Sequence, residues 1–225
     1  MEEKAVIVLS GGLDSTTCMG IAKNEGYELY PITFQYGQRH DREVEQAKKI
    51  AEHYDIREHR IVDISFFQQI GGSALTDQSI DVPETMVEGD IPVTYVPARN
   101  MIFLSLASAY AEVIGAEAIY IGVSSVDYSG YPDCRPEFIK SMNKTVNLAT
   151  KVGVSDKGMV INTPLMHLTK AETIIEGIKL NVPYHLTTSC YNGEDKACGT
   201  CDSCQLRLKG FLEAGEKDPI PYKDR

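Results

Sequence analysis

Short hydrophobic runs alternate with longer segments of helical spacing along most of the chain. Four runs have the length of strands buried on both faces: residues 5–10, 28–36, 59–64 and 118–123. Three segments between them have the spacing or the length of helices: residues 15–24, 41–55 and 100–116. Because strands and helices alternate, the pattern predicts an α/β fold with a doubly wound, mainly parallel sheet of the Rossmann type. Such sheets bind ligands beyond the carboxyl ends of their strands.

Turn residues and polar segments separate these elements. Gly26 is a candidate stop for the first helix, and Asp41 is a candidate N-cap for the second. Residues 66–95 have few periodic hydrophobic positions and several Gly, Asp and Pro residues, so we expect a long loop there. We expect two parts, a nucleotide-binding α/β domain over 1–165 and a helical segment with a metal site over 166–225.

The first expected strand leads directly into the turn SGGLDSTT at residues 10–17. A strand, a Gly-Gly turn and a helix start form an anion site, because free N–H groups and the positive end of the helix dipole face the ligand. Ser10, Ser15, Thr16 and Thr17 add hydroxyl donors. Asp14 would repel phosphate unless it binds a cation such as Mg²⁺ or caps backbone N–H groups. The turn therefore predicts a site for a metal-bound nucleotide.

The spacing of this turn excludes two common phosphate-binding motifs. A P-loop has a Lys-Ser/Thr pair after its second glycine and the dinucleotide fingerprint is GxGxxG, and the turn matches neither. The sequence SGGLDST instead resembles the SGGxDS loop of the ATP pyrophosphatases, adenine nucleotide alpha-hydrolase-like enzymes that adenylate a carboxyl, carbonyl or amide and release pyrophosphate. That resemblance implies an ATP site at Leu9, Ser10, Gly11, Gly12, Leu13, Asp14, Ser15, Thr16, Thr17, Cys18 and Met19.

Four of the six cysteines lie close together near the C-terminus, at Cys190, Cys198, Cys201 and Cys204. Two CxxC steps that share a cysteine, with a fourth thiol upstream, suit one tetrahedral metal ion. Because four thiolates leave no open position for water, we expect a structural zinc site on which the fold of the C-terminal tail depends. An iron–sulfur cluster and a redox-active CxxC are the alternatives.

The other cysteines, the histidines and the basic segments give weaker signals. Cys18 is expected to be a small buried residue, and the role of Cys134 is left open. No pair of the five histidines has ligand spacing. The segments QAKK (46–49) and RLK (207–209) are interpreted as solvated helix faces.

Three further polar segments adjoin the expected elements: VPARN at 96–100, GVSSVDYSGYPDCRPEF at 122–138 and TPLMHLTKAE at 163–172. In the last, a capping box of Thr169 and Glu172 places Lys170 in the first turn of a helix. Together with SGGLDST and the four-cysteine tail, these segments closely resemble the 7-cyano-7-deazaguanine synthase family of queuosine biosynthesis, from residue 5 to about residue 207.

The resemblance implies an ATP-dependent carbon–nitrogen ligase. Its substrates would be 7-carboxy-7-deazaguanine, ammonia and ATP, its product 7-cyano-7-deazaguanine, and its intermediates an adenylated carboxylate and an adenylated amide. The resemblance also implies bound zinc, Mg²⁺ that accompanies ATP, and a homodimer.

We assign hypothetical roles to the polar residues of these segments. Asp14 would place Mg²⁺, and Arg99 and Lys170 would balance charge on the phosphates or on the substrate carboxylate. Asp133 would accept hydrogen bonds from the N–H and amino groups of the deazaguanine ring, and Arg135 would hold a carboxylate. The full set of candidate substrate-binding residues is Asn100, Asp127, Tyr131, Asp133 and Arg135.

The composition narrows the range of partners. The 22 Lys and Arg residues and the 32 Asp and Glu residues give a formal net charge of −10, without a dense basic cluster, so we expect no nucleic acid partner. Because there is no pattern of a secretory signal and no hydrophobic run long enough to span a bilayer, we expect a cytoplasmic protein without membrane contact.

Two rival functions stay open at this point. A pyrophosphate-loop enzyme that adenylates a tRNA base for thiolation or amination would need a basic surface and a catalytic cysteine pair, for which Cys18 and Cys134 are the candidates. A nucleotide sensor or interaction module without enzymatic activity would bind ATP and release no AMP.

Overall fold

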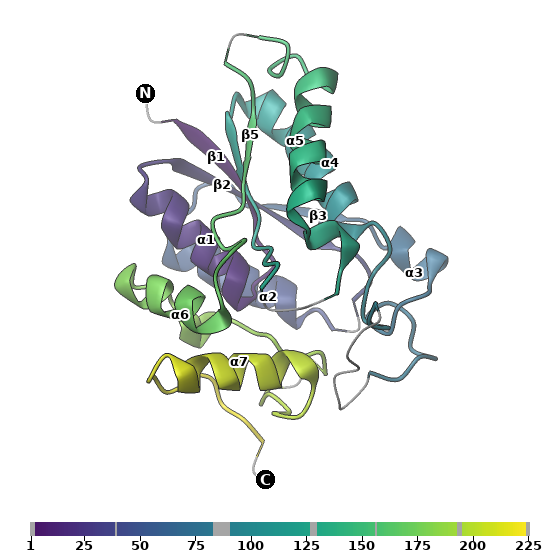
Figure 1. The fold of residues 1–225 in the computed structure, drawn as a ribbon, viewed down its shortest axis with the longest axis vertical. Coiled ribbons are helices and arrows are strands. Elements are labelled where there is room, and N and C mark those ends of the chain that lie inside the picture. The colour runs from purple at the N-terminus through teal and green to yellow at the C-terminus, as the bar shows by residue number, and fades with distance from the viewer. Residues whose placement is uncertain are drawn as a thin grey trace.

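A parallel sheet of five strands forms the centre of the computed structural model, which describes residues 3–38, 40–82, 91–126, 130–155, 157–192 and 195–223 (Figure 1). Its strands are β1 (Lys4–Val8), β2 (Glu28–Gln35), β3 (Arg60–Asp63), β4 (Ala118–Tyr120) and β5 (Val160–Asn162). They are arranged in the order β3-β2-β1-β4-β5, and every pairing is parallel. In the central strand, Val6 lies opposite Tyr30 of β2 and Ile119 of β4. The predicted parallel, doubly wound sheet is confirmed.

Helices cover both faces of this sheet (Figure 1). They are α1 (Leu13–Asn24), α2 (Arg42–His53), α3 (Phe66–Ile70), α4 (Arg99–Ile114), α5 (Pro136–Ala149), α6 (Lys170–Lys179) and α7 (Asp202–Glu213), with the 3₁₀ helices η1 (Pro132–Cys134) and η2 (Tyr184–Leu186). Successive side chains of a strand point to opposite faces. Val6 and Val8 are therefore buried against α4 and α5, whereas Ala5 and Ile7 are buried against α1 and α2. The sheet lies between two hydrophobic cores.

The C-terminal segment adds a third, smaller core. Helices α6 and α7 lie side by side at the lower end of the view in Figure 1. Leu13, the first residue of α1, packs in a cluster with Ile174 of α6 and Phe211 of α7. Beyond α7 the chain returns to the cysteine-rich loop, where Ala197 pairs with Tyr222 in an isolated parallel bridge. This packing brings the start of α6 next to the start of α1.

Several element predictions need correction. The expected loop at 66–95 begins with the short helix α3, and its residues 83–90 lie outside the described part of the chain. Neither α5 nor β5 is among the predicted elements; β5 has three residues, and its Val160 is 52% exposed, so it offers no continuous hydrophobic run. Asp41 does occupy the N-cap position of α2, but its side chain accepts a hydrogen bond from Gln35 Nε2 at 3.0 Å and caps no helix N–H.

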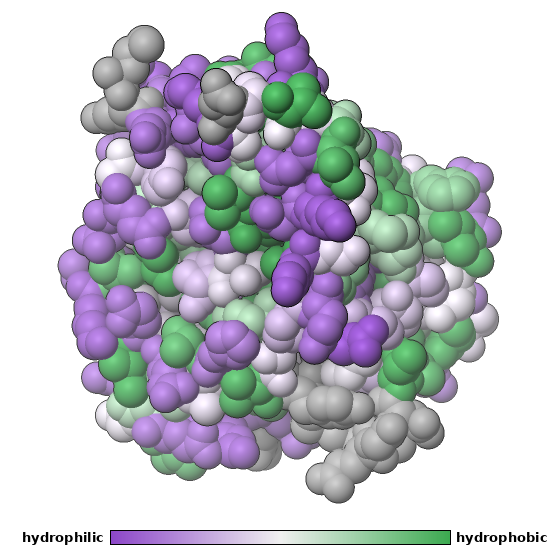
Figure 2. Space-filling view, turned by 45° about the horizontal axis from the view of Figure 1, so that its top comes forward, coloured by the Kyte–Doolittle hydropathy of each residue, from purple (hydrophilic) through white to green (hydrophobic). Residues whose placement is uncertain are grey.

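Hydrophilic residues cover much of the face shown in Figure 2, and hydrophobic residues are scattered among them. Within the residues that the structure describes, no helix is long and hydrophobic enough to cross a membrane.

Candidate active site and metal centre

The candidate active site lies at the carboxyl ends of β1 and β4. From β1 the chain continues to β2 on one side of the sheet, and from β4 it continues to β5 on the other side, so the two strands flank the point where ligands bind in such sheets. A tight turn connects β1 to α1, and Gly12 is the N-cap of that helix. Gly11 has a φ of +80°, in the left-handed region that favours glycine. The N–H of Ser10 donates to Ser15 Oγ at 3.1 Å, and the N–H of Gly12 donates to Ser10 Oγ at 3.2 Å. These bonds fix the conformation of the turn. As at the start of every helix, the first N–H groups of α1 have no intrahelical acceptors, so they are available to a ligand.

Two glycines allow neighbouring segments to approach this turn closely. A Cβ added at Gly11 would lie 2.3 Å from the carbonyl oxygen of Glu43 in α2. A Cβ added at Gly122, which follows β4, would lie 2.8 Å from the carbonyl carbon of Asp14. Neither position can carry a side chain unless the backbone moves. Helix α2 and the segment after β4 therefore pack directly against the turn.

Only part of the predicted ATP loop faces the cleft. The loop residues that line it are Ser10, Gly12, Leu13, Asp14 and Ser15. Thr16 and Thr17 are buried, and their hydroxyls donate to the carbonyl oxygens of Gly12 and Leu13. Leu9, Cys18 and Met19 belong to the core between the sheet and the first two helices. The prediction that Cys18 is a small buried residue is confirmed.

Asp14 and Lys170 form an ion pair in the cleft, although 156 positions separate them in the sequence. Lys170 Nζ lies 2.7 Å from one carboxylate oxygen of Asp14 and 2.8 Å from the other. The Lys170 side chain is 14% exposed and that of Asp14 is 34% exposed. Lys170 is the first residue of α6, whose start is fixed by the capping box of Thr169 and Glu172, as predicted. The cleft thus holds a cation for phosphate oxygens and a carboxylate that could bind Mg²⁺.

Arg99 and three tyrosines form another part of the cleft lining. Arg99 begins α4, and its guanidinium carbon lies 5.6 Å from the ring centroid of Tyr36 and 5.9 Å from that of Tyr131. Burial raises the pKa of Tyr36, and it raises the pKa of Tyr191 well above the usual value, so both phenols stay neutral at physiological pH. A cation among neutral aromatic rings suits a planar, anionic ligand.

Glu43, in the first turn of α2, also lines the cleft and is absent from the sequence-based candidates. Its side chain is half-buried, and burial raises the pKa of its carboxyl, an effect that the charge of Arg99 partly offsets. A signal was available in the order of elements, because Glu43 lies in the first turn of the helix that follows β2, and the strand and helix meet at the carboxyl edge of the sheet.

Two predicted substrate-binding residues, Asn100 and Asp133, are hydrogen-bonded to each other at the start of α4. Asp133 is buried, and its Oδ2 accepts a hydrogen bond from the backbone N–H of Asn100 at 2.9 Å. Asn100 Nδ2 donates to the carbonyl oxygen of Asp133 and to Cys134 Sγ, both at 3.3 Å. Asn100 and Cys134 line the cleft, whereas Asp133 does not. The structure therefore gives the carboxylate of Asp133 a helix-capping contact.

The remaining predicted substrate residues are spread more widely. Tyr131 lies in the cleft. Arg135 is exposed, its Nε donates to the carbonyl oxygen of Pro132 at 3.2 Å, and it lines a surface pocket that adjoins the cleft at Tyr131. Asp127 lies outside the described residues.

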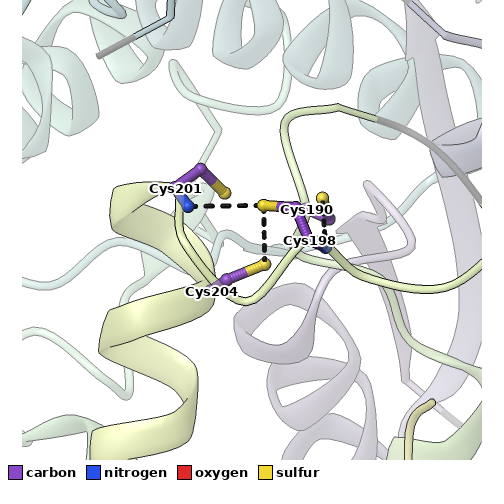
Figure 3. A group of neighbouring side chains, drawn as sticks. All are labelled: Cys190, Cys198, Cys201 and Cys204. Atoms are coloured by element: carbon purple, nitrogen blue, oxygen red, sulfur yellow. Dashed lines mark hydrogen bonds between the residues drawn. The ribbon is translucent and has the colours of Figure 1, made fainter. Parts of the chain in front are cut away.

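The four C-terminal cysteines converge, and their sulfur atoms all lie within 4.8 Å of one another (Figure 3). Cys201 is the N-cap of α7 and Cys204 lies in its first turn, whereas Cys190 and Cys198 come from the preceding loop. The N–H groups of Cys201 and Thr200 donate to Cys198 Sγ at 3.3 and 3.4 Å, and that of Cys198 donates to Cys190 Sγ at 3.3 Å. Such donors stabilise thiolates, the form that binds metal, so this sulfur set fits a structural zinc ion.

Arg207 lies on α7, the helix that carries Cys204 of the candidate metal centre, and it also lines the cleft. It is 1% exposed, and its Nε and Nη2 lie 2.7 and 3.0 Å from the two carboxylate oxygens of Asp218. The interpretation of 207–209 as a solvated helix face is therefore wrong for Arg207. Arg207 lines the cleft together with Ser189 and Tyr191, the two neighbours of a predicted metal ligand. One chain segment thus serves both the cysteine cluster and the wall of the cleft.

Two solved structures have a similar fold. A 4-thiouridine synthetase in complex with RNA and ATP superposes with a TM-score of 0.53 at 20% identity, covering 95% of this chain and 50% of that chain. A predicted subunit of a tRNA methyltransferase from Methanocaldococcus jannaschii has a TM-score of 0.51 at 16% identity, covering 100% of this chain and 94% of that chain. At these identities the likeness shows a shared fold.

Sequence comparison identifies much nearer relatives. The 7-cyano-7-deazaguanine synthase of Oceanobacillus iheyensis is 61% identical over 220 residues, which cover 98% of each chain. A protein of the same name from Acetivibrio thermocellus is 59% identical and covers 99% of each chain. The model of the family described as queuosine biosynthesis protein QueC matches residues 4–215. With this match and these relatives over nearly its whole length, the chain belongs to the QueC family of queuosine biosynthesis proteins.

Proposed function

We propose that the protein converts 7-carboxy-7-deazaguanine, ammonia and two molecules of ATP into 7-cyano-7-deazaguanine. The names of the relatives support the product, and the family description supports the pathway. The observation that carries the chemistry is the Asp14–Lys170 pair beside a glycine turn at the start of α1. It offers backbone N–H donors, a cation and a Mg²⁺ ligand to one triphosphate.

The conversion needs two activations of the same kind. A carboxylate oxygen attacks the α-phosphorus of ATP, and pyrophosphate leaves. Ammonia then attacks the acyl adenylate, and AMP leaves with the bridging oxygen, giving the amide. The amide oxygen attacks a second ATP in the same way, and loss of AMP and of the nitrogen-bound protons leaves the nitrile. Because the electrophile and the leaving groups are the same in both halves, one phosphate turn can serve both.

In this mechanism the protein acts by positioning and by neutralising charge. The N–H groups at the start of α1 would hold the phosphates, and Asp14 would hold Mg²⁺ that accompanies ATP. Lys170 and Arg99 would balance the charge of the phosphates and of the substrate carboxylate, and Tyr131 would contact the ring. The four cysteines would hold zinc away from the reacting atoms. Assembly as a homodimer is part of the proposal and rests on the family resemblance alone.

Adenylation of a tRNA base is the less favourable alternative. The formal net charge of −10 opposes binding to a phosphate backbone. Thiolation would also need a nucleophilic cysteine. Burial, together with the charge of Asp14, raises the pKa of the Cys18 thiol well above its usual value, which disfavours the reactive thiolate.

The proposal is tested by incubating the purified protein with ATP, Mg²⁺, ¹⁵N-ammonium and 7-carboxy-7-deazaguanine, with products followed by mass spectrometry. We expect ¹⁵N-labelled nitrile and two AMP per nitrile, with no nitrile when ammonium is omitted. Formation of AMP only in the presence of bulk tRNA, or binding of ATP without AMP release, would favour one of the rival functions and overturn the proposal.

A further inference from the structure

Two acidic residues line the cleft within the described part of the chain, Asp14 and Glu43, and their surroundings differ. Asp14 is paired with Lys170 beside the phosphate turn. The carboxylate of Glu43 makes no hydrogen bond and no ion pair among the described residues, although its side chain is half-buried. A carboxylate that is partly desolvated without donors raises the free energy of the site, and a ligand with matching donors would lower it.

The backbone of Glu43 is fixed relative to the phosphate turn. Its carbonyl oxygen lies so close to Gly11 that a Cβ there would be 2.3 Å away. The neighbouring residue Val44 is buried and anchors the first turn of α2. The carboxylate is thus carried on backbone that packs against the phosphate turn, and not on a free surface loop.

The carboxylate also adjoins the aromatic part of the cleft. The positive charge of Arg99 lowers the pKa of the Glu43 carboxyl, and the negative charge of Glu43 raises the pKa of Tyr36. Arg99 in turn lies over the rings of Tyr36 and Tyr131. A planar ligand that packs on these tyrosine rings would therefore face the carboxylate of Glu43 at one part of its edge. It would face the guanidinium group of Arg99 at another.

We infer that Glu43 is a specificity-determining residue that accepts two hydrogen bonds from the ring N–H and the exocyclic amino group of the 7-deazaguanine. This inference rests on the proposed function. In 7-deazaguanine the two N–H groups are adjacent and point in the same direction, so they match the two oxygens of one carboxylate. The substrate carboxylate, which Glu43 would repel, is then directed to the cations Arg99 and Lys170. Asp133 cannot take this place without leaving the N–H of Asn100 that it caps.

The test uses the full-length protein and two ring systems: 7-carboxy-7-deazaguanine and the analogue that lacks the exocyclic amino group. Binding is measured by calorimetry without ammonia, and kcat/KM is measured with both compounds. The variant is Glu43→Gln. The matched control is Glu52→Gln, because Glu52 lies on the exposed side of the same helix.

We expect the wild-type protein and Glu52→Gln to prefer the amino compound by about 10- to 100-fold. Glu43→Gln should weaken binding of the amino compound by a similar factor, change binding of the analogue by less than about threefold, and leave the affinity for ATP unchanged. The preference for the amino group should therefore disappear in the variant. Glu43→Asp, which keeps the charge, should retain part of it, and it serves as the second variant if Glu43→Gln does not fold.

Two outcomes would overturn the inference. If Glu43→Gln weakens the binding of both compounds by the same factor, the carboxylate does not read the amino group. If it leaves both affinities unchanged and alters only the dependence of the rate on ammonium, Glu43 handles a proton of the nucleophile. Failure of the proposed function is distinguishable from both, because the wild-type protein would then form no nitrile from the amino compound.

Discussion

Asp14 occupies a position where a negative charge is favourable even before ATP binds. It lies in the first turn of α1, where the helix dipole stabilises anions, and Lys170 Nζ lies within 2.8 Å of both its oxygens. Because the pair is partly buried, water and salt screen it less than a surface pair. The carboxylate and the ammonium group are thus held in place beside the turn before any ligand binds.

Substitution of Asp14 by alanine should lower kcat for nitrile formation by at least about 100-fold, because the proposed Mg²⁺ ligand and the partner of Lys170 are both removed. Lys170→Ala should show a loss of similar size. Lys179→Ala provides the control, since this lysine ends the same helix at the surface and pairs with Glu176. Undiminished turnover of Asp14→Ala would contradict the role given to the turn.

His59 is expected to make the free energy of unfolding depend on pH. Thr33 Oγ1 donates its single hydrogen to the carbonyl oxygen of Leu9 at 2.6 Å, so His59 Nε2, 2.8 Å from that hydroxyl, must be the donor in their contact. Burial, and to a lesser extent the charge of Lys48, lowers the pKa of His59 from its usual 6.5.

As the pH falls, the unfolded chain therefore takes up the proton on His59 first. The free energy of unfolding should decrease between about pH 7 and pH 5, and this decrease should be smaller in His59→Gln, which keeps a donor but does not titrate. Denaturant titrations at the two pH values measure the effect. An equal decrease in the variant, or an NMR titration of His59 above 6.5, would count against it.

Residues next to a strong local signal were predictable, and residues placed by tertiary packing were not. Asp14 belongs to a motif and Lys170 lies within a capping box, so both could be named as candidates from the sequence. Arg207 shares a helix face with the buried residues Cys204 and Phe211, and this spacing indicates burial. Because Arg207 is charged and begins the basic segment 207–209, the sequence instead suggested an exposed position. Glu43 depends on where α2 packs against the turn, which the sequence does not state.

At the scale of elements, buried strands and long helices were predictable because hydrophobic periodicity records them directly. The central strand β1 contains the continuous hydrophobic run 5–8, and residues 31–34 of β2 are all buried. β5 has only three residues at the edge of the sheet, and the five residues of α3 are too few to show a helical period. The sequence pattern also left the partners of each element open, so the packing of α6 on α1 appeared only in the structure.

The close contact between the segment after β4 and the start of α1 leads to a prediction for Gly122. A Cβ at this position would lie 2.8 Å from the carbonyl carbon of Asp14 and 2.9 Å from the nitrogen of Ser15, so the start of α1 must shift in Gly122→Ala. We expect the affinity for ATP to fall by about tenfold or more, measured by calorimetry. Gly26→Ala is the control for backbone strain alone: its φ of +91° should lower the stability of the fold, but its Cβ meets no atom within 4 Å, so its ATP affinity should stay that of the wild type. Wild-type ATP affinity in Gly122→Ala would show that the contact does not position the turn.

At the scale of the whole molecule, the C-terminal segment completes the cleft from outside the sheet. α6 carries Lys170, and the loop that holds the candidate metal ligands carries Ser189 and Tyr191 into the cleft lining. Asp218 and Tyr222 return from beyond α7 to this region, where the Tyr222 hydroxyl donates to Asp218 at 2.6 Å. Metal binding and substrate binding should therefore be coupled.

Elemental analysis should find one zinc ion per chain in the wild-type protein and in Cys18→Ser, and none in Cys198→Ser. Loss of the metal should lower Tm by about 5 °C or more, expose the chain after residue 189 to proteolysis, and weaken substrate binding. Iron in place of zinc would overturn the assignment of the metal. Unchanged substrate affinity in a folded, metal-free protein would separate the metal centre from the cleft.

In the proposed reaction, one phosphate turn activates the same substrate twice by transfer of AMP. Both transfers can be followed with 7-carboxy-7-deazaguanine that carries ¹⁸O in both carboxylate positions, by mass spectrometry of AMP, pyrophosphate and phosphate. Each activation passes one substrate oxygen to AMP, so both AMP molecules formed per nitrile should carry one ¹⁸O, and pyrophosphate should carry none. ¹⁸O in inorganic phosphate together with ADP, or only one labelled AMP per nitrile, would contradict the account.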